Sequence, residues 1–234
     1  MDLPLISVII PVFGSTKHLP RVFHSLNIQT YPNIEIIVVD DGSDTAVSCQ
    51  PLAVSHKLMQ IRQEHQGAAA ARNTGFKASH GEYVIFWDAD VIGEPGMFMG
   101  LFQALQSRPD ASYAYSSFWF GQRRMPSHMF DGDALKKKNF ISTMSLIRRQ
   151  DFPGFDESLK RFQDWDLWLT LLSREKKGVF VPEYLFRAMP KKEGISFWLP
   201  TFAYKKPWRF LPGIRQRVRA YENARDIIRQ KHSL

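Results

Sequence analysis

The sequence has almost no cysteine and no long apolar run. Its single cysteine, Cys49, excludes an intramolecular disulfide and argues against a cysteine-based metal site. The apolar stretch 5–13 is interrupted by Pro11 and follows no basic segment, which is typical of a first strand and not of a signal peptide. No other stretch approaches the roughly 18 to 20 apolar residues of a membrane-spanning helix. We therefore expect a cytoplasmic protein without a membrane span.

Most of the chain also lacks net charge. Residues 1–186 carry 19 Lys or Arg against 20 Asp or Glu, whereas residues 187–234 carry 12 against 3. The formal net charge of +8 therefore comes from the last fifth of the chain. Because the larger part is nearly neutral and contains no nucleic-acid-binding motif, we do not expect nucleic acid as a partner.

Short apolar runs alternate with helical patterns. The runs 5–10, 34–39 and 83–87 are rich in β-branched and aromatic residues and end at acidic or turn-forming residues, as buried strands do. Helical spacing of apolar residues follows from Leu19 to Leu26, and an alanine-rich segment covers 68–79. This alternation predicts an α/β fold, with a mostly parallel central sheet flanked by helices. At 234 residues, one compact unit is expected.

The later part of the chain has a different pattern. From Ser112 to the basic run 136–138, aromatic and basic residues predict strands and irregular structure. An apolar stripe after Asp164 predicts a helix over 164–175, and Val179 begins a further strand.

Three polar clusters, 40–43, 67–75 and 88–90, follow or separate the predicted strands. In an open α/β sheet, ligands bind beyond the carboxyl ends of the strands. Asp88 and Asp90 are two residues apart, so both carboxylates can point to one side and hold Mg²⁺ or Mn²⁺ while leaving positions for phosphate oxygens. The alternative is an ordinary surface turn.

The other two clusters also have two interpretations. Asp40 and Asp41 form a turn with Gly42, or one of them accepts hydrogen bonds from a base or a ribose. Arg72, followed by Asn73, is a surface arginine on an ordinary helix, or it reaches a nucleotide between small neighbours.

Asp164 is the most ambiguous carboxylate. An Asp immediately before an apolar helical stripe is a preferred N-cap. The family resemblance described below implies a different role for it, that of a general base, which is worth roughly 10²- to 10⁴-fold in rate. Asp166 is expected to be a first-turn residue that matches the helix dipole.

Together these motifs resemble the family 2 glycosyltransferases of the GT-A fold. The match runs in order from about residue 5 to residue 196. The motifs that carry it are Pro11-Val12-Phe13, Asp40-Asp41-Gly42-Ser43, Gly67 with Ala71-Arg72-Asn73-Thr74-Gly75, Asp88-Ala89-Asp90 and Gln163-Asp164-Trp165-Asp166.

The resemblance implies an inverting, metal-dependent transfer of a sugar from a nucleotide-sugar, with a UDP-sugar expected, to an acceptor hydroxyl in polysaccharide or glycoconjugate synthesis. It implies that Asp41 lines the nucleobase pocket, that Arg72 lies against the base or diphosphate, that Asp88 and Asp90 hold Mn²⁺ or Mg²⁺, and that Asp164 is the catalytic base. The residues implied to bind the donor and its cation are Pro11, Val12, Phe13, Asp40, Asp41, Gly67, Arg72, Asn73, Asp88, Ala89 and Asp90.

Two positions depart from the family pattern. Gln163 stands where a Glu commonly precedes the base, which removes a charge. Met189 stands where a His that can touch the cation often follows an Arg, and Lys191 or Lys192 could compensate by binding diphosphate. A catalytically silent nucleotide- or glycan-binding relative is therefore the alternative function. A nucleotidyltransferase would need a richer phosphate loop than 13–17 provides.

The resemblance also suggests a domain division. Residues 1–193 form the expected GT-A domain, with a nucleotide-sugar-binding half to about 110 and an acceptor-binding half over about 111–193. Residues 194–234 form a basic, aromatic extension. This extension suits an anionic membrane surface, consistent with a lipid-linked sugar acceptor and peripheral attachment. Alternatively, it packs on its own domain or on a second subunit in a homodimer.

Overall fold

The computed structural model describes residues 3–14, 17–47, 56–190 and 212–234, and these form an α/β fold around one nine-stranded sheet. The strands are β1 (Ile6–Val12), β2 (Ile34–Asp41), β3 (Lys57–Gln63), β4 (Tyr83–Phe86), β5 (Val91–Gly93), β6 (Ala111–Phe120), β7 (Arg123–Met125), β8 (Leu146–Arg148) and β9 (Lys177–Ala188). The helices are α1 (Leu19–Asn27), α2 (Ala68–Ala78), α3 (Met97–Ser107), α4 (Gly132–Lys137), α5 (Gln163–Ser173) and α6 (Pro212–Lys231), with a 3₁₀ turn over Arg149–Asp151.

The sheet has two parts that meet at β8. Its order is β3-β2-β1-β4-β8-β6-β9-β5, with β7 paired to β6. Strands β3, β2, β1 and β4 are parallel. Beyond them, β8 is antiparallel to both β4 and β6, β6 and β9 are parallel, and β5 and β7 are antiparallel to their neighbours. The α/β sheet flanked by helices is confirmed, and its antiparallel pairs all lie in the carboxyl-terminal part.

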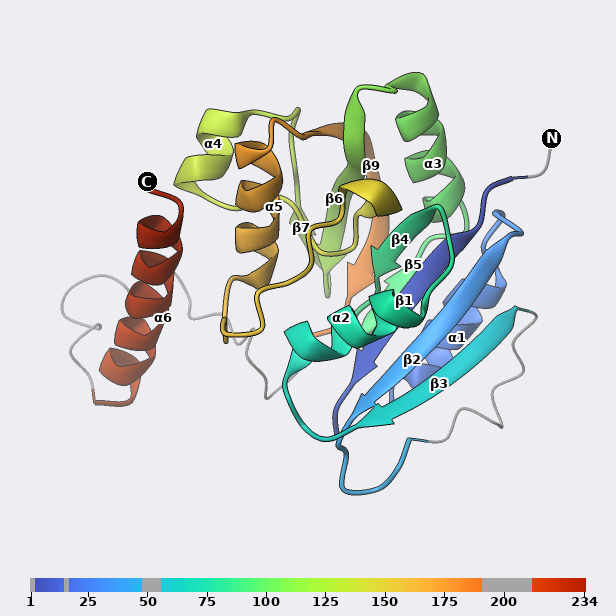
Figure 1. The fold of residues 1–234 in the computed structure, drawn as a ribbon, viewed down its shortest axis with the longest axis horizontal. Helices are drawn as coiled ribbons and strands as arrows, with labels where there is room; N and C mark the ends of the chain where they lie inside the picture. Colours follow the sequence, from blue (N-terminus) through green and yellow to red (C-terminus); the bar gives the residue numbers. More distant parts are fainter. Residues whose placement is uncertain (1–2, 15–16, 48–55, 191–211) are drawn as a thin grey trace.

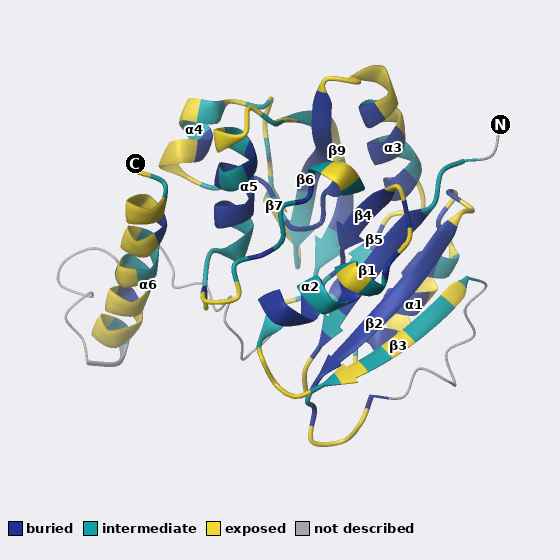
Figure 2. Ribbon diagram, in the orientation of Figure 1, coloured by how far each residue is buried: buried dark blue, intermediate teal, exposed yellow. Residues whose placement is uncertain are grey.

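Each face of the sheet has its own hydrophobic core. The central strands β1, β2 and β4 between the two cores are coloured as buried in Figure 2. One core joins the strands to α1 and α3, and the other joins them to α2 and α5, with Leu135 of α4 and Ile228 of α6 added to it. Strands β1, β2 and β4 are buried on both faces, as their continuous apolar runs predicted.

The strand order places a ligand crevice at the carboxyl ends of β1 and β4. The chain passes from β1 outwards to β2 and β3 and then returns to the other side of β1 as β4. This reversal is the topological switch point at which α/β sheets bind ligands. Phe13 directly follows β1, and Asp88 lies two residues beyond β4.

Glycine lets α2 lie unusually close to this part of the sheet. A Cβ atom on Gly75 would lie 2.5 Å from Cγ2 of Ile9 and 3.1 Å from Cγ2 of Val39. Real Cβ atoms almost never approach so closely, so a larger residue would push the helix outwards. Gly75 therefore determines how close the α2 face that carries Arg72 lies to the sheet.

Most of the elements expected from the sequence are present, with one clear error. The strand predicted at 83–87 is β4, the alanine-rich segment is α2, and the helix expected over 164–175 is α5. The basic run 136–138 was assigned to strands or irregular structure, but its first residues belong to the short helix α4. Its N-cap, Asp131, accepts hydrogen bonds from the backbone N–H groups of Asp133 and Ala134.

Candidate functional site

Asp40 organises the loop after β2. Its side chain is fully buried and accepts hydrogen bonds from the backbone N–H groups of Ser43, at 3.0 Å, and Val47, at 3.1 Å. Burial acts to raise the pKa of Asp40, but these hydrogen bonds and the charge of Arg62 outweigh it and hold the pKa below its usual value. Because Asp40 pairs in register with Val12 of β1, the loop is fixed beside the end of that strand.

Asp41 ties β2 to the loop that leads into α2. Its Oδ1 atom accepts hydrogen bonds from Nε2 of Gln63, at 2.8 Å, and from the backbone N–H of Gln66, at 2.9 Å. Its Oδ2 atom accepts one from the backbone N–H of Gly67, at 2.8 Å, and lies 3.0 Å from Nδ1 of His65. Gly67, the N-cap of α2, has a φ of 97°, which favours glycine. Asp41 therefore positions the start of α2.

An exposed aromatic pair stands beside this loop. The Phe13 ring is stacked on His65, with ring centroids 4.0 Å apart and an interplanar angle of 26°. Phe13 is 59% exposed, so one face of its ring is accessible to a ligand. Gly42 allows the approach, because a Cβ atom there would lie 2.7 Å from the backbone nitrogen of His65. The pair offers a flat surface that suits a nucleobase. No sequence motif marked His65, which lies in a polar loop.

Arg72 connects the loop after β4 with the start of α5. Its guanidinium donates a hydrogen bond from Nη2 to Oδ1 of Asp88, at 2.8 Å, and another from Nη1 to Oε1 of Gln163, at 2.9 Å. The side chain is only 10% exposed and lies over the Phe155 ring, 5.3 Å from its centroid. Its buried Nε atom has no partner in the described residues. The bridge brings residue 88 of the polar cluster after β4 together with the start of α5.

Asp88 and Asp90 lie in the loop between β4 and β5. The Asp88 side chain is 36% exposed, and its Oδ2 atom lies 3.4 Å from Oγ1 of Thr143. The carbonyl of Asp90 accepts a hydrogen bond from the backbone N–H of Met189, at 2.9 Å, so this end of β9 is fixed beside the cluster.

The carboxylates of Asp88 and Asp90 fit a divalent cation that also binds phosphate oxygens. Within the described residues, no three His, Cys, Asp or Glu side chains form a group that could enclose a metal ion. Mg²⁺ in nucleotide sites needs only one or two carboxylates, because phosphate and water complete its coordination. Partly exposed Asp88, with Asp90 two residues away, matches that pattern and not the pattern of a closed structural metal site.

Asp164 lies in the first turn of α5 and does not cap it. The N-cap is Phe162, which adopts the left-handed conformation with a φ of 59° and makes no side-chain cap. The N-cap interpretation of Asp164 is therefore wrong, because the helix begins at Gln163. Instead, Oδ2 of Asp164 accepts a hydrogen bond from Nδ2 of Asn139, at 2.7 Å.

Burial raises the pKa of Asp164 above its usual value. The backbone N–H of Trp165 and the charge of Arg72 oppose this shift, whereas Asp88 adds to it. A carboxylate with a raised pKa and an anchoring hydrogen bond is suited to proton abstraction. Asn139, which anchors it, was not marked by any sequence motif.

Asn73 holds the loop before α5 in place by hydrogen bonds. Its amide donates to the carbonyl of Phe155 and to Oε1 of Glu157, and its Oδ1 atom accepts a hydrogen bond from the backbone N–H of Phe155. All these contacts go to the loop before α5. Asn73 therefore holds the segment that carries Phe155 against Arg72.

Helix α6 packs on the chain's own domain. Lys231 forms ion pairs with Asp156, at 2.6 Å, and with Asp166, at 2.8 Å, and His232 lies 2.8 Å from Asp166. The Lys231 ammonium holds the pKa of Asp156 at about 2. As expected, Asp166 lies in the first turn of α5. Helix α6 lies beside α5 (Figure 1), and its last residue, Lys231, contacts Asp166. The rest of the predicted extension, residues 194–211, and also Lys191 and Lys192, lie outside the described residues.

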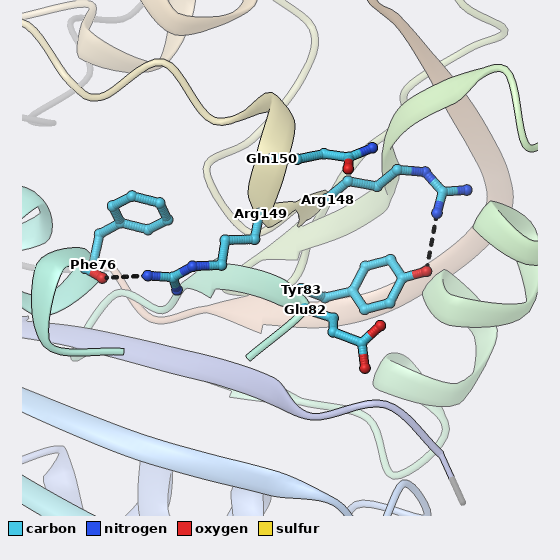
Figure 3. A pocket seen from close by; sticks show the side chains of 6 residues that line it. All are labelled: Phe76, Glu82, Tyr83, Arg148, Arg149 and Gln150. Carbon is cyan, nitrogen blue, oxygen red and sulfur yellow. Dashed lines mark hydrogen bonds between the residues drawn. The ribbon is translucent and has the colours of Figure 1, made fainter. Parts of the chain in front are cut away.

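A hollow lies at the opposite end of the strands. It has a volume of about 470 Å³ and is lined by residues that include Tyr83, the first residue of β4. Figure 3 shows that Arg148 turns to the Tyr83 hydroxyl and Arg149 to the carbonyl of Phe76. Both guanidiniums already have protein partners, and the hollow lies at the amino ends of the strands. It therefore takes no part in the site at their carboxyl ends.

Comparisons with known proteins agree with this arrangement. Residues 7–155 match the profile of Glycosyl transferase family 2. An uncharacterized glycosyltransferase of Rickettsia typhi is 29% identical over 187 residues, which cover 72% of this chain and 59% of that protein. Glycosyltransferase GlyG of Streptococcus pneumoniae is 34% identical over 119 residues, covering 49% and 39%. The chain thus spans well under two thirds of the length of these relatives.

Solved structures have the same fold at low identity. TarS of S. aureus, in complex with UDP-GlcNAc, matches with a TM-score of 0.68 and 20% identity over 83% of this chain and 61% of that chain. A mannosyltransferase of Pyrobaculum calidifontis, in complex with GDP-Man and Mn²⁺, matches with a TM-score of 0.61 and 17% identity, covering 82% and 58%. At these identities the likeness concerns the fold.

Proposed function

The chain belongs to Glycosyl transferase family 2, and from this premise we propose that it transfers a sugar from a nucleotide-sugar to an acceptor hydroxyl with inversion. We take a UDP-sugar as the donor, since the neighbour with the higher TM-score of the two compared above was solved with UDP-GlcNAc. The observation that carries the proposal is the Arg72 bridge. It joins Asp88, on the side expected to bind the donor, to the helix turn that holds Asp164.

The donor side would hold a nucleotide with groups of three kinds. The stacked pair of Phe13 and His65 offers a flat surface to the base. Asp88 and Asp90 would hold a divalent cation, which neutralises charge on the departing diphosphate when bound. Arg72 would place a fixed positive charge beside the same phosphates.

The acceptor side would use Asp164 as the general base. The raised pKa keeps the carboxylate basic enough to take a proton from the attacking hydroxyl. Asn139 fixes the position of this carboxylate by a hydrogen bond to Oδ2. With one such carboxylate and direct displacement, the hydroxyl attacks the face opposite the departing diphosphate. Inversion at the anomeric carbon follows.

A panel assay separates this enzyme from a catalytically silent nucleotide-binding relative. The protein is incubated with UDP- and GDP-sugars, with Mn²⁺ or with EDTA, and release of the nucleoside diphosphate and the anomeric configuration of the product are measured by NMR. Cation-dependent release and an inverted product are expected. Tight UDP binding without release from any donor would support the silent relative. A product with retained configuration would overturn the inverting mechanism.

The proposal extends to polysaccharide or glycoconjugate synthesis at the cytoplasmic surface of a membrane, with a lipid-linked acceptor. No helix in the described parts of the chain is long and apolar enough to cross a membrane. Helix α6 packs Ile228 into the core of its own domain and exposes Arg215, Arg219 and Arg229, which could attract anionic lipid. Vesicle flotation tests this attachment. Absence of binding to anionic vesicles would exclude the attachment, and binding that does not change when these three arginines become glutamines would exclude their role in it.

A further inference from the structure

A cluster of two aromatic and two arginine side chains covers one end of the sheet, outside the residues used so far. It consists of Trp119 of β6, Arg124 of β7, and Tyr184 and Arg187 of β9, and we call it the aromatic–arginine cluster. The Arg124 guanidinium lies 5.2 Å from the centroid of the Trp119 ring and 5.8 Å from that of Tyr184. The Arg187 guanidinium lies 5.0 Å from the Trp119 ring. Trp119 and Tyr184 are themselves 5.2 Å apart.

The strand registers force these four side chains onto one face. Trp119 pairs with Arg124 across the antiparallel β6–β7 ladder and with Arg187 across the parallel β6–β9 ladder. Tyr184 pairs with Ser117, two residues before Trp119 and so on the same face of β6. The cluster is therefore set by backbone pairing and not by chance contacts of long side chains.

The same face of β6 leads to the proposed catalytic base. Tyr113, six residues before Trp119 and on its face, packs on Trp168 of α5, with ring centroids 4.6 Å apart. Helix α5 directly precedes β9, and β9 begins beside the start of β6. The end of α5 therefore lies near the start of β6, and its first turn lies toward the other end of β6, which carries Trp119. The cluster thus lies on the α5 face, at the edge toward which the Asp164 turn points.

Hydrogen bonds connect this edge to Asp164 through one loop. The hydroxyl of Ser117 accepts a hydrogen bond from the backbone N–H of Ser127, and the hydroxyl of Ser127 donates to the carbonyl of Phe140. Phe140 follows Asn139, whose amide holds Asp164. The loop between β7 and β8 therefore spans the space between the cluster and the base.

The arginines of the cluster lack acidic partners. In the part of the chain that the structure describes, neither Arg124 nor Arg187 forms an ion pair with a carboxylate. Arg187 donates one hydrogen bond to the carbonyl of Gly121, which fixes its position and leaves most of its N–H groups available. Arg124 is exposed. Arginines stacked on aromatic rings keep their N–H edges free for bidentate binding of an anion.

We propose that the aromatic–arginine cluster binds a phosphate group of the acceptor, either a phosphodiester or a diphosphate next to the sugar or polyol whose hydroxyl is glycosylated. This proposal rests on the proposed function, because it takes the α5 side of the site to be the acceptor side. Two rigid guanidiniums match the oxygens of a phosphate, and a neutral glycan would leave both charges uncompensated. The cluster would then place the acceptor phosphate at a fixed distance from Asp164.

The donor diphosphate is the competing source of the same chemistry. Arg187 precedes Ala188 and Met189, and the Met189 backbone contacts Asp90, so one arginine lies toward the predicted cation-binding loop. Arg124 has no such backbone connection, because β7 pairs with the edge of β6 opposite to β9, although its guanidinium reaches the Tyr184 ring. Arg124 is therefore the residue that distinguishes acceptor phosphate from donor phosphate.

Calorimetric titration of the full chain with glycerol 3-phosphate, and separately with UDP and Mn²⁺, tests the assignment. Arg124→Ala is expected to weaken glycerol 3-phosphate binding at least about tenfold. UDP affinity should stay within about twofold. Arg124→Lys keeps the charge but not the planar fork, and should recover only part of the loss. Arg21→Ala, which removes an exposed arginine from α1 on the other face of the sheet, is the matched control and should change neither affinity.

Each contrary result has a separate meaning. Glycerol 3-phosphate binding that is absent from the wild-type protein, or equal in Arg124→Ala and wild type, overturns the phosphate site. An equal loss of glycerol 3-phosphate and UDP affinity in Arg124→Ala assigns the cluster to the donor and overturns the acceptor assignment. If phosphate binding depends on Arg124 but no nucleotide-sugar is turned over by the wild-type protein, the proposed function fails and the phosphate site remains.

Discussion

The two halves of the site are held together in different ways. On the β1–β4 side, Asp40 and Asp41 accept hydrogen bonds mainly from backbone N–H groups and side chains of the loops that follow β2 and β3. On the α5 side, Asp164 depends on Asn139 from the loop before β8, and Gln163 depends on Arg72 from α2. The first half is held mainly by backbone N–H groups, and the second by a few side-chain contacts.

This difference indicates where each half is sensitive to substitution. Many backbone hydrogen bonds survive a single side-chain change, whereas a site held by two or three side-chain bonds can lose its geometry through one change. We therefore expect the base and its surroundings to be the fragile half. The following experiments test that contrast.

Replacement of the base should have the largest effect. Asp164→Asn should lower kcat by roughly 10²- to 10⁴-fold with UDP affinity unchanged, because it removes only proton abstraction. The pKa of Asp164 is higher in the folded chain than in the unfolded chain. This difference stabilises the fold at a pH below the unfolded pKa, and the stabilisation is lost as the pH rises through the folded pKa. At neutral pH the variant should therefore unfold at the same or a higher temperature. Turnover and calorimetric melting are the measurements, and unchanged turnover would remove Asp164 from the role of base.

Loss of the bridge should rank second and affect both halves. Arg72→Ala removes two charged hydrogen bonds, one to Asp88 and one to Gln163. A hydrogen bond to a charged group is worth about 1.5–3 kcal/mol, so kcat/KM should fall about 10- to 100-fold. UDP affinity should fall with it, unlike in Asp164→Asn. Arg62→Ala, a half-exposed arginine beside Asp40, is the control. If Arg72→Ala affects turnover alone, the two halves are not coupled through this residue.

The pH dependence of turnover should also identify the base. Asp164 must be charged to take a proton, and burial raises its pKa, so kcat should fall about tenfold per pH unit below that raised value. The falling limb should lie at higher pH than the usual pKa of an aspartate, about 3.9. A kcat profile recorded with saturating donor shows its position. A limb at or below the usual value would contradict the burial argument.

Helix α6 should affect stability more than activity. The double variant Lys231→Ala with His232→Ala removes both of these ion-pair contacts from buried Asp166, which should lower the free energy of unfolding by roughly 1–3 kcal/mol. Arg229→Ala, from an exposed position in the same turn, should change it little. Urea denaturation measures both. A loss of turnover without a loss of stability would mean that α6 acts on the site directly.

The smallest effect is expected at the position that departs from the family pattern. Gln163→Glu would strengthen the contact with Arg72 but lose the hydrogen bond that Nε2 donates to the carbonyl of Leu159, at 2.7 Å. These changes oppose one another, so the activation free energy and the free energy of unfolding should each change by less than about 1 kcal/mol. A gain in turnover of tenfold or more would show that the missing charge limits catalysis.

The sequence revealed the strand ends better than the contacts between distant segments. Continuous apolar runs that stop at Asp40 or Asp88 mark buried strands and their carboxyl ends, and the position of a ligand crevice follows from that. The helical stripe after Asp164 marked α5. It could not give the start of the helix, because Phe162 takes a left-handed cap conformation that only tertiary packing explains.

The remaining partners were not visible because the signal for them is not local. Asn139 lies 25 residues from Asp164, and Gln163 lies 91 residues from Arg72. Asn139 is a common polar residue without a motif, and the contact of Gln163 with Arg72 joins two motifs that only the fold brings together. His65 is similar, since its place on Phe13 depends on the missing side chain of Gly42.

The contact of Gly75 with the sheet has a consequence for protein engineering. Arg72 and Gly75 are three residues apart and share one helical face, so the first methyl group added at position 75 would act as a wedge beneath the arginine. A library designed to change donor preference should keep this glycine constant and diversify the loops instead. Otherwise, variants that lose activity through a lifted helix would be mistaken for variants with altered selectivity.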